Sequence, residues 1–206
     1  PLENILLKKT VDPEIREDLN IMKQNTERLL SLTNQLLDFR KTESQGFRLN
    51  FAECNVTEVL KETYNRFTSL ARQRELDFVL NVAEQDFYAH VNKEAFTKIV
   101  SNLLNNAVKY AETYVHVFLE MNGIGEKRMF YIRTVNDGVI IPNEMKEEIF
   151  KPFVRFNEKE DGKVTTGTGI GLALSRSLAE LHQGSLMMLE GEEANVFCLS
   201  LPVEQG

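Results

Sequence analysis

Cysteine and histidine are scarce in this sequence, and their scarcity excludes one class of site. The two cysteines, Cys54 and Cys198, lie far apart without a C-x-x-C spacing, and the three histidines do not cluster with them. Zinc sites need closely spaced Cys and His ligands, so we expect none here. Two separated thiols are typical of reduced proteins, which predicts a cytoplasmic setting.

Long apolar runs and an excess of basic charge are also missing. No uninterrupted apolar stretch approaches the ~18 residues that a membrane-spanning helix requires. The net charge is −7 and the isoelectric point is near 5.2, whereas nucleic-acid binding depends on clustered Lys and Arg. We therefore expect no nucleic-acid partner and no membrane-inserted segment. The 206 residues, 42% of them hydrophobic, suffice for one sizeable core and a smaller helical unit.

The best-defined helical pattern runs from Asn92 to Tyr110. Its apolar residues recur at helical spacing, namely Phe96, Ile99, Val100, Leu103, Leu104, Ala107 and Val108. Asn102, Asn106 and Lys109 fall at i, i+4 and i+7, which predicts one shared face. An amide oxygen can bind Mg²⁺, and a lysine one turn on can reach phosphates that the metal also contacts. A solvated polar face explains the same pattern equally well.

A glycine-rich segment precedes a second helical pattern. Gly167, Gly169 and Gly171 are followed by apolar residues at helical period. Glycine allows close approach of the backbone to a ligand, and a helix start offers unpaired N–H groups to an anion. The segment 167–174 therefore suits a polyphosphate, although it matches neither the phosphate loop nor the dinucleotide fingerprint. A flexible loop before a well-capped helix is the alternative.

The remaining pattern predicts the fold class. We expect a two-layer α/β sandwich, in which helices cover one face of a mixed, mostly antiparallel sheet. A long helix with a stripe of apolar and threonine side chains, from Pro13 to about Lys41, precedes it and predicts helix packing, either in a dimeric four-helix bundle or in an intramolecular core. Two units result, 1–43 and 44–206. Strands are predicted at about 49–52, 76–82, 86–91, 113–121, 128–135, 185–190 and 195–201, and helices at about 55–72 and 92–110.

Four segments together resemble a known family. In order, they are "KIVSNLLNNAVKY", "VNDGVIIP", "IFKPFVRF" and "GTGIGLAL" with "LHQGSL". They resemble the N, G1, F and G2 boxes of the histidine kinases of two-component signalling, members of the wider ATPase superfamily that includes gyrase and heat-shock ATPases. The resemblance covers residues 98–185 and implies a Bergerat-type ATP-binding fold. Residues 1–43 resemble the end of the family's dimerisation hairpin.

The resemblance implies ATP and Mg²⁺ as ligands. Asn106 matches the metal-binding asparagine, and Asn102 the residue that assists the metal and the phosphates. Lys109 and Tyr110 match a pair that contacts phosphate and nucleotide, and Arg155 the lid arginine that reaches the γ-phosphate. Asn102, Asn106, Lys109 and Arg155 form the implied catalytic set. The other implied nucleotide contacts are Asn136, Asp137, Gly138, Ile141, Gly167, Thr168, Gly169, Ile170, Gly171 and Leu172.

The third box and the segment after it predict a lid over the nucleotide. Phe150 and Phe153 match aromatics that pack such a lid rather than take part in chemistry. The charged segment between Arg155 and Thr166 has no apolar period and is expected to be mobile. A plain surface loop is the alternative.

Two departures from the family pattern stand out. The G1 box usually reads D-N-G-x-G-I, and its aspartate accepts a hydrogen bond from the adenine amino group; this chain has Asn136-Asp137-Gly138-Val139-Ile140. Either Asn136 accepts through its amide oxygen or Asp137 takes that role, and adenine affinity is expected to fall. The H-E-x-x-T-P acceptor motif is also missing, and we expect structural roles for His90, His116 and His182. Since "PLENILLKK" resembles the run after that motif, we expect the chain to be a fragment.

The resemblance implies that the γ-phosphoryl of Mg·ATP passes to a histidine of the dimerisation helix. A response-regulator receiver domain, separate or fused, would then receive the phosphoryl group. The full protein would be a homodimer through the helical hairpin, and this chain would be the cytoplasmic portion of a membrane-anchored sensor. A degenerate module that relays signals without catalysis is the alternative. A third possibility is an ATP-hydrolysing relative of gyrase type, but those enzymes use an acidic base where this chain has Asn102.

Overall fold

The computed structural model describes residues 13–44, 48–122, 128–156, 167–191 and 193–204. Its centre is a five-stranded sheet in the strand order β2-β4-β5-β7-β6. Only the β2–β4 pair is parallel, and the other neighbours are antiparallel. The strands are β2 (Asp77–Asn81), β4 (Tyr114–Asn122), β5 (Met129–Asn136), β6 (Ser185–Leu189) and β7 (Asn195–Pro202). The prediction of a mixed, mostly antiparallel sheet is confirmed.

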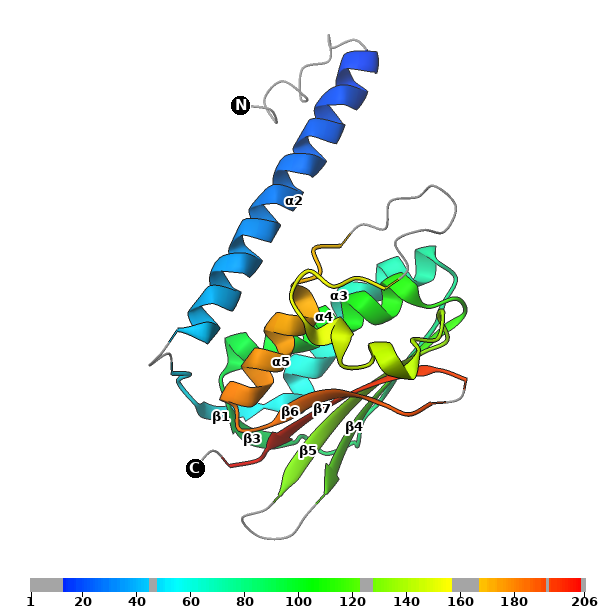
Figure 1. Cartoon of the computed structure of the whole chain (residues 1–206). Coiled ribbons are helices and arrows are strands. Elements are labelled where there is room, and N and C mark those ends of the chain that lie inside the picture. The colour runs from blue at the N-terminus through cyan, green and yellow to red at the C-terminus, as the bar shows by residue number, and fades with distance from the viewer. Residues whose placement is uncertain (1–12, 45–47, 123–127, 157–166, 192, 205–206) are drawn as a thin grey trace.

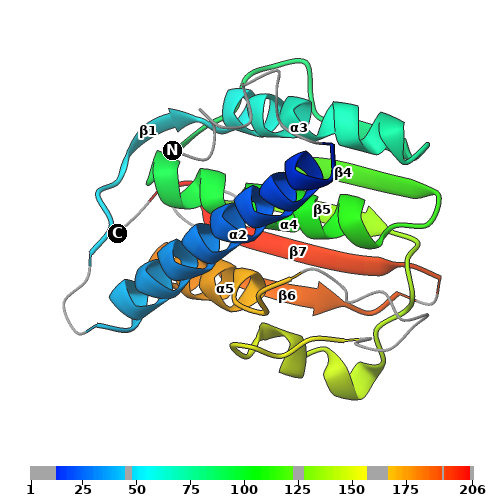
Figure 2. The ribbon, with the colours of Figure 1, turned by 90° about the horizontal axis from the view of Figure 1, so that it is seen from above.

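Three helices cover one face of this sheet, as Figures 1 and 2 show. They are α3 (Val56–Gln73), α4 (Lys93–Tyr110) and α5 (Gly171–Leu181). Burial alternates along β5, where Phe130 and Ile132 are completely buried, because successive strand residues point to opposite faces. The buried face packs against α4, whose apolar stripe lies entirely in the core. The predicted two-layer sandwich is confirmed.

Asparagine caps fix where the first two of these helices begin. The Oδ1 atom of Asn55 accepts a hydrogen bond from Glu58 N at 3.0 Å, and that of Asn92 accepts one from Ala95 N at 2.9 Å. Each cap satisfies a first-turn N–H that has no partner within the helix. A small antiparallel sheet of β1 (Ala52–Asn55) and β3 (Tyr88–Val91) leads into both helices.

The predicted strand at 49–52 is wrong in its bounds. The strand begins only at Ala52, because its partner β3 ends at Val91, which pairs with Ala52. Two short 3₁₀ helices, η2 (Asn143–Met145) and η3 (Glu148–Phe150), connect β5 toward α5.

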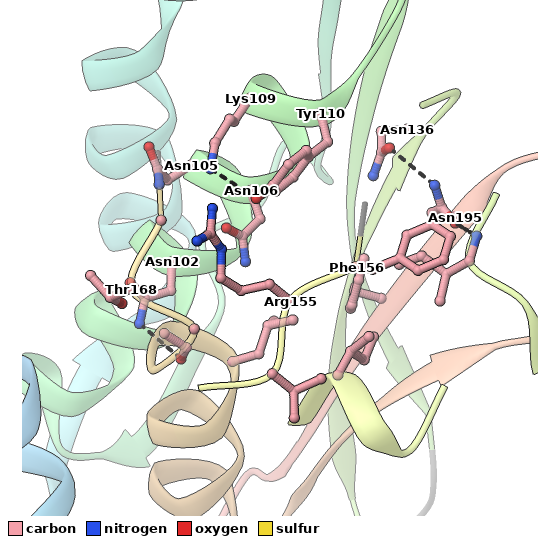
Figure 3. A pocket seen from close by; sticks show the side chains of 18 of the residues that line it. Asn102, Asn105, Asn106, Lys109, Tyr110, Asn136, Arg155, Phe156, Thr168 and Asn195 are labelled. Carbon is pink, nitrogen blue, oxygen red and sulfur yellow. Dashed lines mark hydrogen bonds between the residues drawn. The ribbon is translucent and has the colours of Figure 1, made fainter. Parts of the chain in front are cut away.

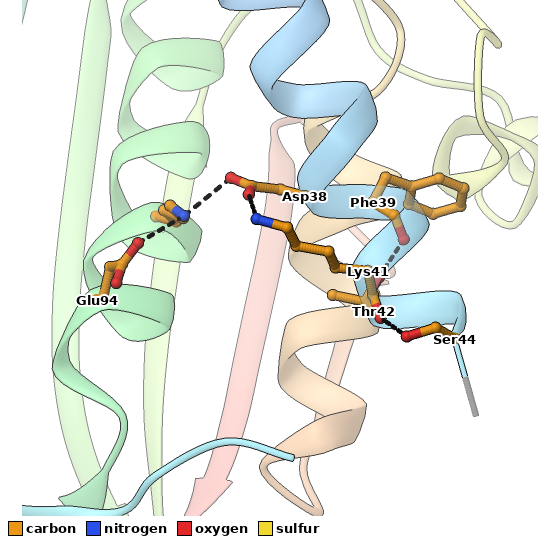
Figure 4. A network of polar contacts seen from close by, with 7 residues as sticks. Asp38, Phe39, Lys41, Thr42, Ser44 and Glu94 are labelled. Carbon is orange, nitrogen blue, oxygen red and sulfur yellow. Dashed lines mark hydrogen bonds and ion pairs between the residues drawn. The ribbon is translucent and has the colours of Figure 1, made fainter. Parts of the chain in front are cut away.

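The long helix α2 (Pro13–Glu43) crosses over α4 and α5 on the side away from the sheet (Figure 2). Near its end, Leu32 and Phe39 pack against the core. Lys98 Nζ on α4 pairs with Asp38 Oδ2 at 2.9 Å and with Glu94 Oε1 at 2.8 Å (Figure 4). The apolar stripe of α2 is largely exposed in this single chain; Leu29, for example, is 64% exposed.

The first part of the predicted hairpin lies outside the described residues, so the division into 1–43 and 44–206 stays a prediction. None of the described helices combines the length and the apolar character that a membrane span requires.

Candidate functional site

A cavity of about 450 Å³ opens between α4, the start of α5 and the segment that follows β5 (Figure 3). This volume lies in the range of small-molecule sites. Most of the predicted site residues line it. The lining residues are Gln35, Asn102, Asn105, Asn106, Lys109, Tyr110, Asn136, Val139, Ile141, Ile149, Val154, Arg155, Phe156, Gly167, Thr168, Gly169, Gly171, Leu172, Asn195 and Phe197.

Helix α4 provides a row of amide side chains along one wall. Asn102, Asn106 and Lys109 all line the cavity, so the predicted shared face exists. Asn102 Nδ2 donates to Gly171 O at 3.2 Å and to Ser175 Oγ at 3.1 Å. These two bonds tie α4 to α5. The amide of Asn106 makes no hydrogen bond to any described residue, and it is therefore available to a ligand.

The glycine segment forms the facing wall, close enough that side chains there would crowd α4. A Cβ atom on Gly167 would lie 3.1 Å from Lys109 Nζ, and one on Gly171 would lie 3.6 Å from Asn102 Cγ. Gly171 is also the first residue of α5, whose first-turn N–H groups have no partner within the helix. Two stretches that are far apart in sequence thus meet across one cavity.

Gly169 holds this segment in position through its backbone. Its φ is +69°, a left-handed conformation that favours glycine. Its carbonyl accepts a hydrogen bond from Phe153 N at 2.8 Å. The backbones approach so closely that a Cβ atom on Gly169 would lie 2.8 Å from Phe153 Cα. The glycine segment and the segment of Arg155 are therefore positioned together.

The cavity is basic although the whole chain is acidic. Among its described lining residues, Lys109 and Arg155 are cationic and none is an aspartate or glutamate. Figure 3 shows the guanidinium of Arg155 turned toward Asn106. Lys109 Nζ lies 2.8 Å from the hydroxyl of Tyr110 and 4.4 Å from the centre of its ring. A concave surface with charge of one sign attracts ligands of the opposite charge, so this end suits an anion.

The opposite end of the cavity is apolar with two buried amides. Ile141, Ile149 and Phe197 contribute apolar surface, and Asn136 and Asn195 are each 3% exposed. Asn195, at the start of β7, was not predicted as a site residue. Its only signal is a polar residue just before the alternating run of that strand.

The structure distinguishes between the two G1 residues that the sequence left open. Even-numbered residues of β5 face the core, so Asn136 faces inward and Asp137 points the other way. Asp137 does not line the cavity. Its carboxylate accepts hydrogen bonds from the backbone N–H groups of Glu112, Thr113 and Tyr114 and from the hydroxyl of Thr113. The structure therefore gives no support to the predicted ligand contact of Asp137, and Asn136 is the G1 side chain that lines the cavity.

These hydrogen bonds change the acidity of Asp137. Partial burial alone would raise the pKa of its carboxyl, but the Thr113 hydroxyl and the three amide donors outweigh burial and lower the pKa to about 2. Asp137 therefore clamps the turn between α4 and β4.

Two further predicted contacts lie just behind the cavity surface. Ile170 is 1% exposed and belongs to the core. Gly138 is buried against the backbone of α4, where a Cβ atom would lie 2.0 Å from Tyr110 O. Neither residue lines the cavity, because the close packing that places their neighbours there also covers them.

The two F-box aromatics have different environments. Phe150 is buried, with its ring 6.3 Å from that of Phe197 and the guanidinium of Arg176 stacked 3.8 Å from its centre. Phe153 is 65% exposed and has a φ of +66°. The predicted lid segment lies mostly outside the described residues.

Helix α2 contributes a lining residue that sequence reasoning missed. Thr168 Oγ1 donates to Gln35 Oε1 at 2.8 Å, and Gln35 lines the cavity. No local pattern marks Gln35, because its position depends on how α2 docks onto α5.

The histidines lie away from the cavity, as expected for structural roles. His182 is completely buried; its Nδ1 lies 2.6 Å from Leu178 O, and its Nε2 accepts a hydrogen bond from Asn92 N at 3.2 Å. Burial lowers the pKa of His182, and the hydrogen bond to Leu178 offsets this only in part. His90 and His116 lie on strands β3 and β4.

Comparison with known proteins adds independent findings. The model of the family "Histidine kinase-, DNA gyrase B-, and HSP90-like ATPase" matches residues 91–205. Histidine kinase P4 of Formosa agariphila is 28% identical over 209 residues, covering 100% of this chain and 15% of that protein. The chain therefore spans only a small part of this relative.

Solved structures show the same fold. Full-length ShkA in complex with AMPPNP superposes with a TM-score of 0.80 at 22% identity, covering 98% of this chain and 42% of that one. Histidine kinase ThkA in complex with the response regulator protein TrrA gives a TM-score of 0.70 at 23% identity, covering 98% and 56%. At these identities the likeness establishes a shared architecture.

Proposed function

The chain belongs to the family of histidine kinase-, DNA gyrase B- and HSP90-like ATPases, and from this premise we propose that it is the ATP-binding catalytic part of a sensor histidine kinase. It would transfer the γ-phosphoryl group of ATP to a histidine of the dimerisation helix. A response-regulator aspartate would then receive the group. The P4 relative and the ThkA complex with TrrA are the comparisons that support this proposal.

The distribution of charge in the cavity is the observation that carries the proposal. Lys109, Arg155 and the first turn of α5 gather positive potential at one end, and no described lining residue is acidic. The other end is apolar with buried amides. A molecule with a polyanionic end and a flat heterocyclic end, such as a nucleoside triphosphate, matches this division.

The donor set also fits a magnesium ion. Mg²⁺ prefers oxygen ligands, keeps several waters and is usually held by few protein groups together with substrate phosphates. Asn106 would supply its amide oxygen and Asn102 would assist, because its Nδ2 is already committed to α5 and its Oδ1 is not. The ion would neutralise phosphate charge when bound. The described residues contain no cluster of acidic, histidine or cysteine ligands that would hold a metal by itself.

The residues of the chain would act by positioning and by fixed charge. In phosphoryl transfer the bond from the γ-phosphorus to the leaving ADP oxygen breaks while a bond to the imidazole nitrogen forms. Such transfer needs little covalent help from the protein. Lys109 and Arg155 would stabilise charge on the phosphoryl oxygens as the bond to ADP breaks. An imidazole nucleophile needs no strong base.

The structure also bears on the hydrolytic alternative. Activation of water would call for a carboxylate beside the phosphates, and the described lining residues include none. Transfer to histidine is therefore favoured over hydrolysis.

We further propose a homodimer that forms through α2, because this helix has exposed apolar residues, including Leu29 and Leu30. We also propose a cytoplasmic location for the domain.

Incubation with γ-labelled ATP, Mg²⁺ and a dimerisation domain that carries its histidine tests the proposal. Label should appear on that domain in an acid-labile, alkali-stable form, as expected of phosphohistidine, and an Arg155→Ala variant should transfer much more slowly. Nucleotide binding without transfer would instead favour the degenerate signal-relay module.

A further inference from the structure

The buried amide of Asn136 faces the apolar end of the cavity, and its orientation determines which base fits there. In Figure 3, Asn136 and Asn195 lie at one end, and Asn102 and Thr168 at the other. With the phosphates beside Lys109 and Arg155, the base of a nucleotide reaches Asn136. The inference concerns that base and rests on the proposed function.

The hydrogen bonds of Asn195 are unambiguous. Its Nδ2 donates to Val139 O at 3.0 Å and to Gly138 O at 3.2 Å, and its Oδ1 accepts from Ile141 N at 3.0 Å. Two carbonyls on one side and an N–H on the other leave one assignment of its amide group. Asn195 therefore presents its NH₂ group toward Asn136.

This assignment fixes the amide of Asn136 in turn. Its Oδ1 accepts from Gly138 N at 3.2 Å and lies 3.5 Å from Nδ2 of Asn195, a longer and weaker contact. With the amide flipped, Nδ2 would face the Gly138 N–H, donor against donor, and this hydrogen bond would be lost. Oδ1 therefore points toward the protein, and Nδ2 is the atom left for a ligand.

That nitrogen has no hydrogen-bond acceptor among the described residues, and the cavity gives access to it. No described residue accepts a hydrogen bond from Nδ2 of Asn136. In the described part of the chain, Thr134 Oγ1 is the only fully buried side-chain polar atom without a partner. Nδ2 of Asn136 is thus not sealed in the core, and the cavity is the space that it faces.

We propose that Asn136 is a specificity-determining residue that makes this site bind 6-oxopurine nucleoside triphosphates at least as well as ATP. A 6-oxopurine offers a carbonyl oxygen that accepts a hydrogen bond from Nδ2. Adenine carries an amino group at the same position, so donor would meet donor. A buried polar group left unpaired lowers affinity by about tenfold.

Aspartate at this position would reverse the preference with little change in shape. An Asn136→Asp variant keeps an oxygen toward Gly138 N and Asn195 Nδ2 and so preserves both internal contacts. The atom facing the cavity becomes an acceptor, which pairs with the adenine amino group. One hydrogen-bonding group changes from donor to acceptor, and the side chain gains a negative charge, a change that the control variant below also makes.

The test is isothermal titration calorimetry, in which the wild type and the Asn136→Asp variant are each titrated with ATP and with ITP in the presence of Mg²⁺. These nucleotides differ at the 6-position and in the proton on the adjacent ring nitrogen. The wild type should bind ITP at least as tightly as ATP, and Asn136→Asp should shift the ratio of the two Kd values at least tenfold toward ATP. Asn81→Asp, an exposed residue at the end of β2, should leave both Kd values unchanged.

The outcomes separate this inference from the proposed function. Binding of ATP by the wild type that is measurably tighter than its binding of ITP would overturn the inference and leave the function standing. An unchanged ratio in a folded Asn136→Asp variant would do the same. If neither nucleotide binds, the proposed function fails and the inference fails with it. The wild-type comparison does not depend on how well the variant folds.

Discussion

Replacement of Gly169 by alanine tests whether the glycine segment is held by backbone geometry. Gly169 has a φ of +69°, and a Cβ atom there would lie 2.8 Å from both Cα and C of Phe153. Because the crowded atoms belong to the backbone, they cannot move aside as a side chain would. The hydrogen bond from Phe153 N to Gly169 O is then strained or lost.

The expected cost follows from three contributions. A left-handed conformation costs a residue with a Cβ atom ~1–2 kcal/mol. Overpacking against rigid atoms costs ~1–3 kcal/mol, although relaxation of one strain relieves part of the other. Loss of a hydrogen bond adds ~1 kcal/mol. Gly169→Ala should therefore lower the free energy of unfolding by about 2–4 kcal/mol.

Gly171→Ala is the matched control. It adds the same methyl group at the first residue of α5, with Asn102 Cγ at an ordinary contact distance of 3.6 Å. Alanine there should be neutral or stabilise the fold by ~0.5–1 kcal/mol, because the unfolded chain loses freedom. Equilibrium unfolding in urea, followed by circular dichroism, measures both changes. A Gly169→Ala variant within about 0.5 kcal/mol of wild type would refute the reasoning.

Three further predictions concern pH and ion pairing. The pKa of Asp137 is about 2 in the folded protein, below its ordinary value of 3.8, which applies to the unfolded chain. Its contribution to stability is therefore complete above pH ~4 and is lost as pH falls toward 2. After a discount for solvent screening, this contribution is ~1–2 kcal/mol. The Asp137→Asn variant should therefore be less stable than the wild type at pH 7 and should lose less stability on acidification. Equal dependence of the free energy of unfolding on pH in the two proteins would contradict this. His182 has a lowered pKa, so it contributes stability above pH ~6.5 that is lost as pH falls. The melting temperature of a His182→Gln variant should therefore change less than that of the wild type as pH falls below ~6.5. Asp38→Asn removes the contact to Lys98 and, because the pair is partly exposed, should cost less than ~1 kcal/mol in urea unfolding; a larger loss would show that docking of α2 depends on this pair.

Local sequence signals predicted most of the fold because they act over a few residues. The helices predicted at about 55–72 and 92–110 begin where Asn55 and Asn92 cap them. Alternation along 129–136 set one face of β5 toward the core. The first strand was misplaced because its bounds depend on the length of its partner, β3, which lies far along the chain.

The candidate site was predicted where motifs carry it and missed where tertiary packing creates it. The convergence of Asn102 and Asn106 with the glycine segment followed from the resemblance. Gln35 enters the cavity only through docking of α2, and Asn195 only through pairing of β7 with β5. The opposite directions of Asn136 and Asp137 were predictable from strand alternation, but the motif match left them open.

Calorimetric titration with a non-hydrolysable ATP analogue and Mg²⁺ tests the central claim most directly. The claim is that the amide face of α4 and the glycine segment together bind a magnesium triphosphate. The wild type should bind only weakly when Mg²⁺ is chelated, and Asn106→Ala should abolish binding while Asn65→Ala, an exposed asparagine of α3, leaves it intact. Undiminished affinity in a folded Asn106→Ala variant, or no binding by the wild type, would contradict the claim.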